Sequence, residues 1–548
     1  MIQLGCKAAP MTVALLWLSM AGVVKAQQAG PRLPPLPDPA GGSSTPATGS
    51  SAAVRLAQVP GGADNNLNLP RAERPGGGGE PTDANAGTPG PGTGTGAGTP
   101  GPGTGTGADT AGPGTGTGGA DNDLSLPRAE RPGGGGEPTE AAAAAEPKTD
   151  ETKLLMKLLG REDDAKVKVY GWIQNSFTGN TNGRPRNGQN FGVNPNNLAN
   201  QWMGNQYYLI FEKRLEQNDK INFGFRFDNL FGNDAQFNHA HGIFDRAFKL
   251  NYFAQYDPAQ YYTEVHLPWF TEGGLDIKGG RFYTLAGYEV VPATGRPLLS
   301  VPYMFNYGQP FTHSGMLTTL HLTKNINLYN GAVNGWDRQF DSRLTWSYIG
   351  GFSGNSESGK TSLATTFIGG PDQFPTYLPL SQNPIYPTGS IPPPPQLAGK
   401  TNPGYHSNDR FLFTTVLTHK WSDKFTQVME TDQAWETNVP FAGSLSPGSN
   451  PLARHNAQWY SFGNWFLYQF NEKLTGVWRS EIFRDNNGVR TGTAADYNEF
   501  TVGGIYKPKP YIWIRPEARY DFTNGPKVYN DNTRNSQFTL GFDIILLF

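Results

Sequence analysis

The chain has almost no cysteine and no long apolar run. Cys6 is the single cysteine among 548 residues, which excludes an internal disulfide and a metal site built on several cysteines. No apolar run reaches the roughly 18 residues that a membrane-spanning helix needs. Only 36% of the residues are hydrophobic, and the mean hydropathy is −0.51. A polytopic helical membrane protein is therefore excluded. A transmembrane β-barrel is not, because its lumen face keeps the average hydropathy low.

The chain also has little net charge. Its 44 lysines and arginines nearly balance 46 aspartates and glutamates, for a formal net charge of −2. This balance gives no reason to expect a nucleic-acid partner. Glycine (70) and proline (45) are abundant instead, and they concentrate in the first third of the chain.

Residues 1–26 have the three parts of a secretory signal peptide. Lys7 supplies the positive charge, residues 11–24 form the apolar core, and Val24-Lys25-Ala26 resembles a small-residue cleavage site. The apolar core is too short for an anchoring helix. A lipoprotein signal does not fit, because Cys6 precedes the apolar core instead of following it. The sequence therefore predicts an exported protein.

Residues 27–148 form a low-complexity linker. The stretch Gly61–Thr82 recurs nearly unchanged as Gly118–Thr139, and GPGTGTG occurs three times. Such glycine and proline content cannot bury enough apolar surface to fold, so we expect a disordered segment. A tether and an inert spacer are both compatible with it. Residues 149–165 follow, and Asp150–Leu159 (DETKLLMKLL) predicts a short amphipathic helix at a membrane interface or under a barrel mouth.

The last stretch, Ser536–Phe548, has the pattern of a two-faced strand. Reading SQFTLGFDIILLF from its end, every second residue is apolar, whereas Gln537, Thr539, Gly541 and Asp543 lie between them. A period of two is typical of a β-strand. An apolar face, about 10 residues and a final Phe favour the closing strand of an outer-membrane barrel. From this stretch alone, a half-buried strand of a soluble β-protein stays open.

Similar alternation repeats from residue 166 to the end. Ile221, Phe223, Phe225 and Phe227 alternate with polar residues, and 512–522 repeats the pattern. A soluble sandwich would seldom keep charges on one face of strand after strand and aromatic residues on the other. We predict about 16 antiparallel strands. Their expected ranges are 166–178, 205–215, 220–230, 258–268, 275–284, 313–323, 326–335, 342–352, 360–369, 409–420, 424–436, 457–470, 473–484, 497–507, 511–522 and 536–548.

The connections between these strands alternate in length. Short polar turns, such as Gln217-Asn218-Asp219 and Asn471-Glu472, alternate with long loops at 179–203, 231–257, 285–312, 371–407 and 437–455. This asymmetry is typical of an outer-membrane barrel with short periplasmic turns. The predicted fold is all-β, a transmembrane up-and-down barrel over 166–548 after a disordered N-terminal segment. The final strand should pair with the first.

The stretch Leu275–Leu317 resembles the putative β-barrel porin-2 (OmpL-like) family. Gly280–Thr284 (GRFYT), Gly287–Glu289 (GYE), Pro310-Phe311-Thr312 and the opening Val167–Phe177 carry this resemblance. It covers the barrel region, residues 150–548, and nothing of the linker. It implies a porin-like barrel and supplies no binding residues.

Two motifs could carry other chemistry. GNSESGKT at Gly354–Thr361 fits the phosphate-binding loop pattern, but the next residues are β-branched and soon broken by Gly and Pro, where a helix is needed. We expect a Gly/Ser turn between two strands. His239 and His241 could lie on one side of an extended segment near Asp234 and Asp245, yet two histidines alone do not define a metal site, and we expect a solvated loop. No G-x-S-x-G or H-E-x-x-H motif occurs.

Charged residues on the polar faces are the candidate functional residues. A sixteen-strand lumen is too wide for side chains to fill, so these charges should line an aqueous channel, and the mixture of signs predicts weak ion selectivity. A salt-bridged ladder that stiffens the wall is an alternative. Loop 285–312, rich in Pro, Tyr and Gly, is a candidate constriction. The predicted channel-lining residues are Arg226, Asp228, Arg343, Arg479, Glu481, Glu499, Arg515, Glu517, Arg519 and Asp521.

The predicted function is an outer-membrane porin that passes small hydrophilic solutes and ions by diffusion. It is not an enzyme and needs no cofactor or metal. Its expected partners are outer-membrane lipid, the barrel-assembly machinery through the C-terminal strand, and the solutes themselves. A homo-oligomer is compatible with the sequence, which does not fix the number of copies. The alternatives are a structural barrel with a blocked lumen and a sugar-type channel that stacks solutes on Trp513 or Trp172.

Overall fold

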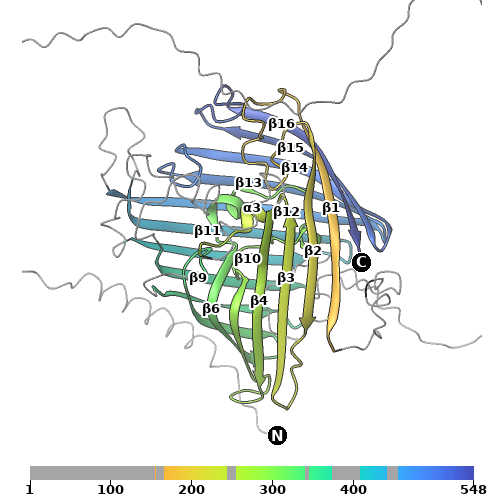
Figure 1. Ribbon diagram of the computed structural model, residues 1–548, viewed down its shortest axis with the longest axis vertical. Coiled ribbons are helices and arrows are strands. Elements are labelled where there is room, and N and C mark those ends of the chain that lie inside the picture. The colour runs from red at the N-terminus through yellow and green to blue at the C-terminus, as the bar shows by residue number, and fades with distance from the viewer. Residues whose placement is uncertain (1–154, 156–165, 243–254, 340–344, 373–407, 441–453) are drawn as a thin grey trace, which may run out of the picture. The chain divides into compact units, whose positions relative to one another are not determined.

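A computed structural model describes Leu155 and residues 166–242, 255–339, 345–372, 408–440 and 454–548. These residues form a closed antiparallel barrel in which each strand pairs with its neighbour in sequence and β1 pairs with β16. Figure 1 shows β1–β4 running steeply in front of the nearly perpendicular β10–β16. The predicted barrel is confirmed. No helix in the described part of the chain is long and apolar enough to cross a membrane.

The barrel has sixteen strands, as the alternation predicts. Their bounds are β1 Lys168–Asn180, β2 Gln201–Lys213, β3 Asn222–Gly232, β4 Gln255–Leu267, β5 Leu275–Tyr283, β6 Thr312–Thr323, β7 Ile326–Val333, β8 Ser347–Asn355, β9 Thr361–Pro371, β10 Asp409–Lys420, β11 Phe425–Pro440, β12 Arg454–Asn471, β13 Leu474–Asp485, β14 Ala495–Lys509, β15 Ile512–Thr523 and β16 Ser536–Leu547. The elements between strands include α3 (Ala235–Asn238), η2 (Ala293–Gly295) and η3 (Met304–Gly308).

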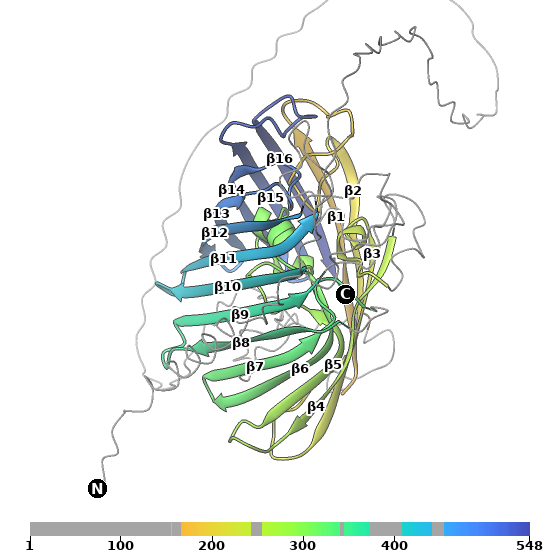
Figure 2. The same ribbon diagram turned by 90° about the vertical axis from the view of Figure 1, so that its left-hand side faces the viewer.

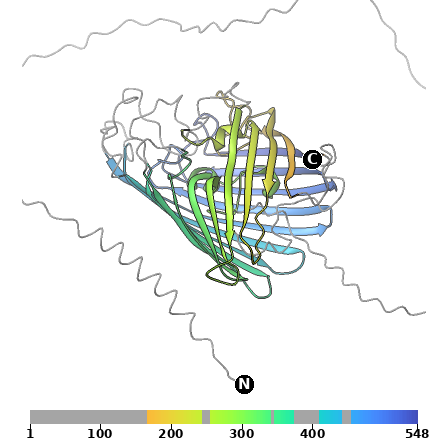
Figure 3. The same cartoon turned by 60° about the horizontal axis from the view of Figure 1, so that its bottom comes forward.

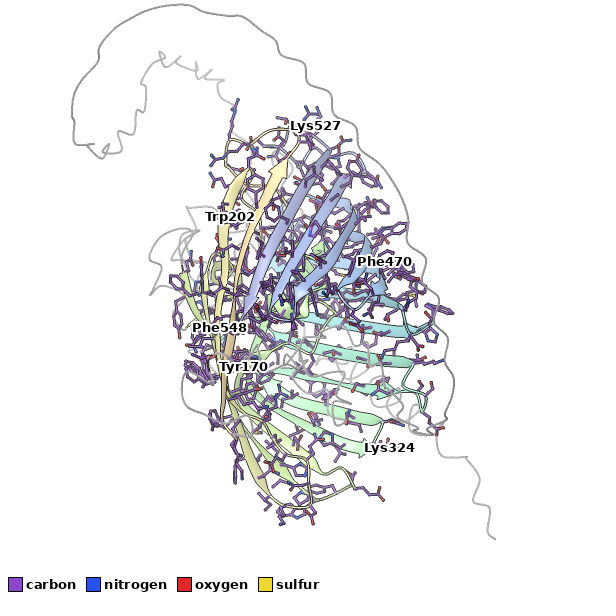
Figure 4. All side chains as sticks on the ribbon, turned by 90° about the vertical axis from the view of Figure 1, so that its right-hand side faces the viewer. Tyr170, Trp202, Lys324, Phe470, Lys527 and Phe548 are labelled. Carbon is purple, nitrogen blue, oxygen red and sulfur yellow. The ribbon has the colours of Figure 1, made fainter. Side chains whose placement is uncertain are left out.

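The two edges of the sheet close on each other through the predicted pair of strands. Trp172 lies opposite Leu547 and Phe177 opposite Phe542 in the β1–β16 register. Beyond the last strand residue, Phe548 and Gly171 exchange two backbone hydrogen bonds of 3.0 Å. Figure 4 shows Phe548 beside Tyr170, with Lys527 at the opposite end of the strands. Closure leaves no row of unpaired backbone groups, which a strand edge in lipid could not tolerate.

The outer surface carries the apolar half of each alternation. Phe538, Leu540, Phe542, Ile544 and Leu546 of β16 are all exposed. Trp202 and Phe470, on distant strands, likewise stand outward in Figure 4. An exposed apolar band of this kind is stable only against lipid, because water would penalise so much apolar area.

The inner surface differs between the two ends of the strands. The long connections 181–200, 284–311 and 486–494 leave one end, and short turns such as 324–325 and 472–473 close the other, where β1 begins and β16 ends. Figures 2 and 3 show the barrel from the side and tilted toward one end, and short helical turns, coloured green, lie within the ring of strands. One of the long connections therefore occupies the interior.

Candidate functional site in the barrel interior

The connection between β5 and β6, residues 284–311, is here called the inner segment. Its central residues are almost completely buried, with Ala293, Leu298, Tyr303 and Met304 each 0% exposed. A surface loop would not bury small and aromatic residues alike. The side chains that contact the inner segment come from the inner faces of several strands. The segment therefore lies inside the barrel, where its length and composition suggested a constriction.

Arginines of the wall hold the inner segment by its carbonyl groups. Arg479 on β13 donates to the Ser300 carbonyl at 2.6 Å. Arg515 on β15 donates to two carbonyls, those of Ala293 at 2.9 Å and Arg296 at 2.6 Å. Guanidinium groups present five donors in a rigid fork, so one arginine can hold several backbone oxygens at once.

Each of these arginines also pairs with a carboxylate of the wall. The distance from Arg479 Nε to Glu499 Oε2 is 2.9 Å, and Arg515 pairs with Asp543. Arg519 pairs with Asp521 at 2.8 Å and donates to the Val301 carbonyl at 2.7 Å. The carboxylate fixes the guanidinium and offsets its charge in a buried position. The alternation of signs along β13–β16 thus builds a row of oriented donors.

Carboxylates of the wall hold the amide groups of the same segment. Glu481 on β13 accepts hydrogen bonds from the backbone N–H groups of Tyr303 at 2.6 Å and Met304 at 2.5 Å. Glu517 on β15 accepts from the N–H of Ser300 at 3.0 Å. Charge-assisted hydrogen bonds to buried backbone are among the stronger ones in proteins. Ser300 is therefore gripped through both its carbonyl and its amide.

Contacts reach the inner segment from other parts of the wall as well. Gln206 on β2 accepts from the Ala293 N–H at 2.9 Å and donates to the Val291 carbonyl at 2.8 Å. Thr366 on β9 donates to the Leu285 carbonyl at 3.2 Å. The indole N–H of Trp459 on β12 donates to the Gly308 carbonyl at 3.0 Å. The segment therefore spans the interior from β2 to β9 and β12.

Aromatic side chains complete the packing. The Tyr303 ring lies 5.9 Å from that of Tyr307 and 5.3 Å from that of Tyr497. The Tyr303 hydroxyl donates to Asp521 at 3.0 Å. Phe305 and Phe311 stack at 4.8 Å. Buried aromatic rings with satisfied hydroxyl groups fix a segment more tightly than polar contacts alone.

The predicted channel-lining residues all point inward where the structure describes them. Arg226 bridges Glu212 at 3.1 Å and Asp228 at 2.7 Å on β2 and β3. Nine of the ten residues lie on inner faces and are buried. Arg343 lies outside the described residues. The expectation that these charges stand in water is wrong, because the inner segment covers those of β13–β15 and salt bridges hold them.

Sequence reasoning missed the apolar residues of the inner face. Trp172, Trp513, Ile545 and Leu547 point inward near the short-turn end and are buried. Trp172 stacks on Tyr208 with ring centroids 4.2 Å apart. The final strand already contained a signal, since Ile545 and Leu547 occupy the face on which Gln537 and Thr539 lie. An apolar inner face implies protein packing inside the lumen.

The other motifs take structural roles. Gly354–Thr361 forms the turn between β8 and β9, with the Ser356 N–H donating to the Thr361 carbonyl at 2.8 Å, as predicted. His239 is buried, which contradicts the expected solvated loop, and its Nε2 lies 2.8 Å from Gln255 Oε1. Asp245 lies outside the described residues. Within the described ranges, no group of three or more His, Cys, Asp or Glu residues is placed to hold a metal ion.

Two groups of the long connections have shifted pKa values. Burial raises the pKa of Asp337 to about 6, although the backbone N–H groups of Thr312 and Phe311 donate to it and oppose the shift. Burial and the neighbouring Arg410 guanidinium lower the pKa of Arg490 to about 9. The Arg490 guanidinium also stacks 4.8 Å from the Trp459 ring centroid. Both groups lie deep in protein.

A closed barrel of sixteen strands, with an apolar outside, a charged inside and a loop folded into the lumen, defines an outer-membrane channel of the porin class. A family model described as "Putative beta-barrel porin-2, OmpL-like" matches residues 166–548, and the chain belongs to this family. The resemblance noted in Leu275–Leu317 is thereby confirmed. Membership places the protein among the passive channels of the outer membrane.

Solved structures of three channels are similar to the chain. One, titled as the anion-selective porin from Comamonas acidovorans, is 10% identical with a TM-score of 0.45, covering 70% of this chain and 99% of that one. The outer membrane channel DcaP of Acinetobacter baumannii is 9% identical with a TM-score of 0.44, at 70% and 97% coverage. OprB of Pseudomonas putida is 11% identical with a TM-score of 0.43, at 73% and 97% coverage. No curated protein sequence matches the chain.

Proposed function

We propose that small hydrophilic solutes and ions diffuse through this barrel past the inner segment, which narrows the passage. The observation that carries this proposal is the attachment of the segment. It is held by hydrogen bonds from wall side chains to its backbone, and no covalent link fixes it. Hydrogen bonds to a backbone exchange with water at modest net cost, so the segment can yield locally while the sixteen-strand wall stays closed.

Conductance of the full chain in planar bilayers tests the proposal. We expect stepwise currents from the purified protein and larger steps from a variant in which residues 287–308 are replaced by a short Gly/Ser linker. Heat-modifiable gel mobility of both proteins serves as the folding control. A folded protein that never opens stepwise pores would contradict the proposal.

We also propose that the nine described candidate residues act on permeating solutes through their charge and through the position of the inner segment. Their contacts support the second route. Arg479, Arg515 and Arg519 each donate to carbonyls of the segment, and Glu481 and Glu517 accept from its amides. Substituting them should therefore alter the unit conductance as well as the ion selectivity.

A second candidate function is a structural barrel whose lumen stays blocked. The extent of the packing favours it, because the inner segment contacts side chains of β2, β9, β11, β12, β13 and β15. The linker variant separates the two functions. Closed wild-type protein together with an open variant would identify a blocked barrel, whereas currents from both would identify a porin.

A sugar-type channel built on Trp513 or Trp172 has less support. Trp172 stacks on Tyr208 and donates its indole N–H to Gln206 at 3.0 Å. Trp513 lies under the Lys507 ammonium, 3.9 Å from the ring centroid. Both indoles are buried, so neither presents a broad open face on which a sugar could stack.

Export by residues 1–26 and assembly through the C-terminal strand complete the proposal. N-terminal sequencing of protein isolated from outer membranes should begin after Ala26. Replacing Phe548 by Ser should reduce the folded fraction in vivo, because the residue ends the strand that assembly machinery would engage. Crosslinking in native membranes would determine whether the barrel forms a homo-oligomer.

A further inference from the structure

The interior of the barrel contains far more buried carboxylates than buried cations. Sixteen aspartates and glutamates are buried among the described residues, against nine arginines and no lysine, an excess of seven negative charges. The acids are Glu212, Asp228, Asp234, Asp257, Glu289, Asp337, Asp372, Glu430, Asp432, Glu436, Glu481, Asp485, Glu499, Glu517, Asp521 and Asp543. The formal net charge of the whole chain is only −2, so the imbalance is concentrated inside.

The arginines are already offset where they stand. Eight of the nine form salt bridges with ten of these carboxylates. Arg226 and Arg410 each pair with two acids. An arginine shared between two carboxylates leaves a local excess of one negative charge. The positive groups that sequence alternation suggested as a balance are therefore neutralised in place.

The other six carboxylates are held by neutral donors. Glu517 accepts from the Ser300 N–H and Glu481 from the amides of Tyr303 and Met304. Glu430 accepts from the Tyr288 N–H at 2.8 Å. Asp337, Asp432 and Asp485 likewise accept from backbone or amide N–H groups. A neutral donor stabilises a carboxylate without cancelling its charge, so the negative potential persists around it.

We infer that the barrel selects cations over anions, and that Glu430, Glu481 and Glu517 are specificity-determining residues. This rests on the proposed function, because selectivity requires passage. A charge excess inside a low-dielectric wall focuses its field into the lumen, where water screens it less than at an open surface. Every ion that crosses the barrel meets this field, whichever side of the inner segment it passes. The selectivity expected is stronger than a mixture of signs suggests.

The test is the reversal potential of the full-length protein in a planar bilayer across a KCl gradient. We expect a potassium-to-chloride permeability ratio on the order of tenfold. Glu430→Gln together with Glu517→Gln should lower the ratio toward 1, since the amide oxygens can still accept the Tyr288 and Ser300 N–H groups. Glu472→Gln, which removes one exposed charge in a short turn, is the matched control and should leave the ratio unchanged.

The outcomes separate the two hypotheses. Absence of stepwise currents would count against the proposed porin function. Stepwise currents with a ratio at or below 1 in the wild-type protein would overturn the cation preference and leave the porin function intact. A ratio that the two glutamine substitutions leave unchanged, in protein whose gel mobility shows a folded barrel, would overturn the assignment of these residues. The wild-type measurement decides the main point even if the double variant fails to fold.

Discussion

Arg515 offers the sharpest test of how the inner segment is held. Its guanidinium pairs with Asp543 and donates to the carbonyls of Ala293 and Arg296, with all partners buried. Arg515→Met keeps the length of the side chain but removes every donor. Asp543 then remains as a buried carboxylate without this cation, a loss of about 3–5 kcal/mol. The carbonyls of two residues of the inner segment lose their donors in the same step.

Arg484 provides a matched control on the opposite face of the wall. Its side chain is 30% exposed and pairs with Asp496 at 3.2 Å, so Arg484→Met should cost less than about 1 kcal/mol. Guanidinium unfolding followed by gel mobility would give the difference in stability, and bilayer recording would give the unit conductance. We expect Arg515→Met to be markedly less stable, with larger or noisier current steps. Equal stability of the two variants, together with unchanged steps in Arg515→Met, would refute the proposed anchoring.

Three further predictions concern other contacts of the interior. Glu481→Ala removes the acceptor of two backbone N–H groups, including that of Tyr303, and should raise the unit conductance, whereas Glu481→Gln should do so less; equal steps would contradict this. Gly503→Val should displace the inner segment, because even a Cβ at Gly503 would lie 2.6 Å from Leu298 Cδ2; the readout is again the size of the current steps. The pKa of Asp337, raised to about 6, lies above its ordinary value of 3.8, so its contribution to stability is present below pH 4 and lost as the pH rises through 6. Asp337→Asn should flatten this dependence, worth at most about 3 kcal/mol, in unfolding midpoints measured at pH 4 and 7.

The outer face of the barrel could be predicted from the sequence because lipid leaves it little freedom. Every outward side chain in the hydrocarbon must be compatible with lipid, so Phe538, Leu540 and Phe542 identify their face without any knowledge of the fold. The same constraint made the sixteen strands countable. Pairing of the last strand with the first followed, because an open edge cannot exist in a bilayer.

The inner face could not be predicted to the same depth, because protein and water share it. Ile545 and Leu547 point into the lumen, although a water-filled barrel would favour polar residues there. The inward direction of Arg515 and Arg519 was predictable from alternation. Their partners were not, since the carbonyls of Ala293 and Val301 lie 222 and 218 residues away in sequence and carry no side-chain signature. A double change of Arg515 and Arg519 to Glu therefore tests anchoring as much as selectivity.

The grip on the inner segment is directed at its backbone. Arg479, Arg515, Glu481 and Glu517 recognise peptide carbonyl and amide groups, which every residue type except proline supplies alike. Side chains of the segment can therefore be exchanged while its path is retained, but the charged residues of the wall cannot. Such a barrel is a natural scaffold for evolving or engineering new permeation properties, because the variable part and its holder are encoded by different stretches of the chain.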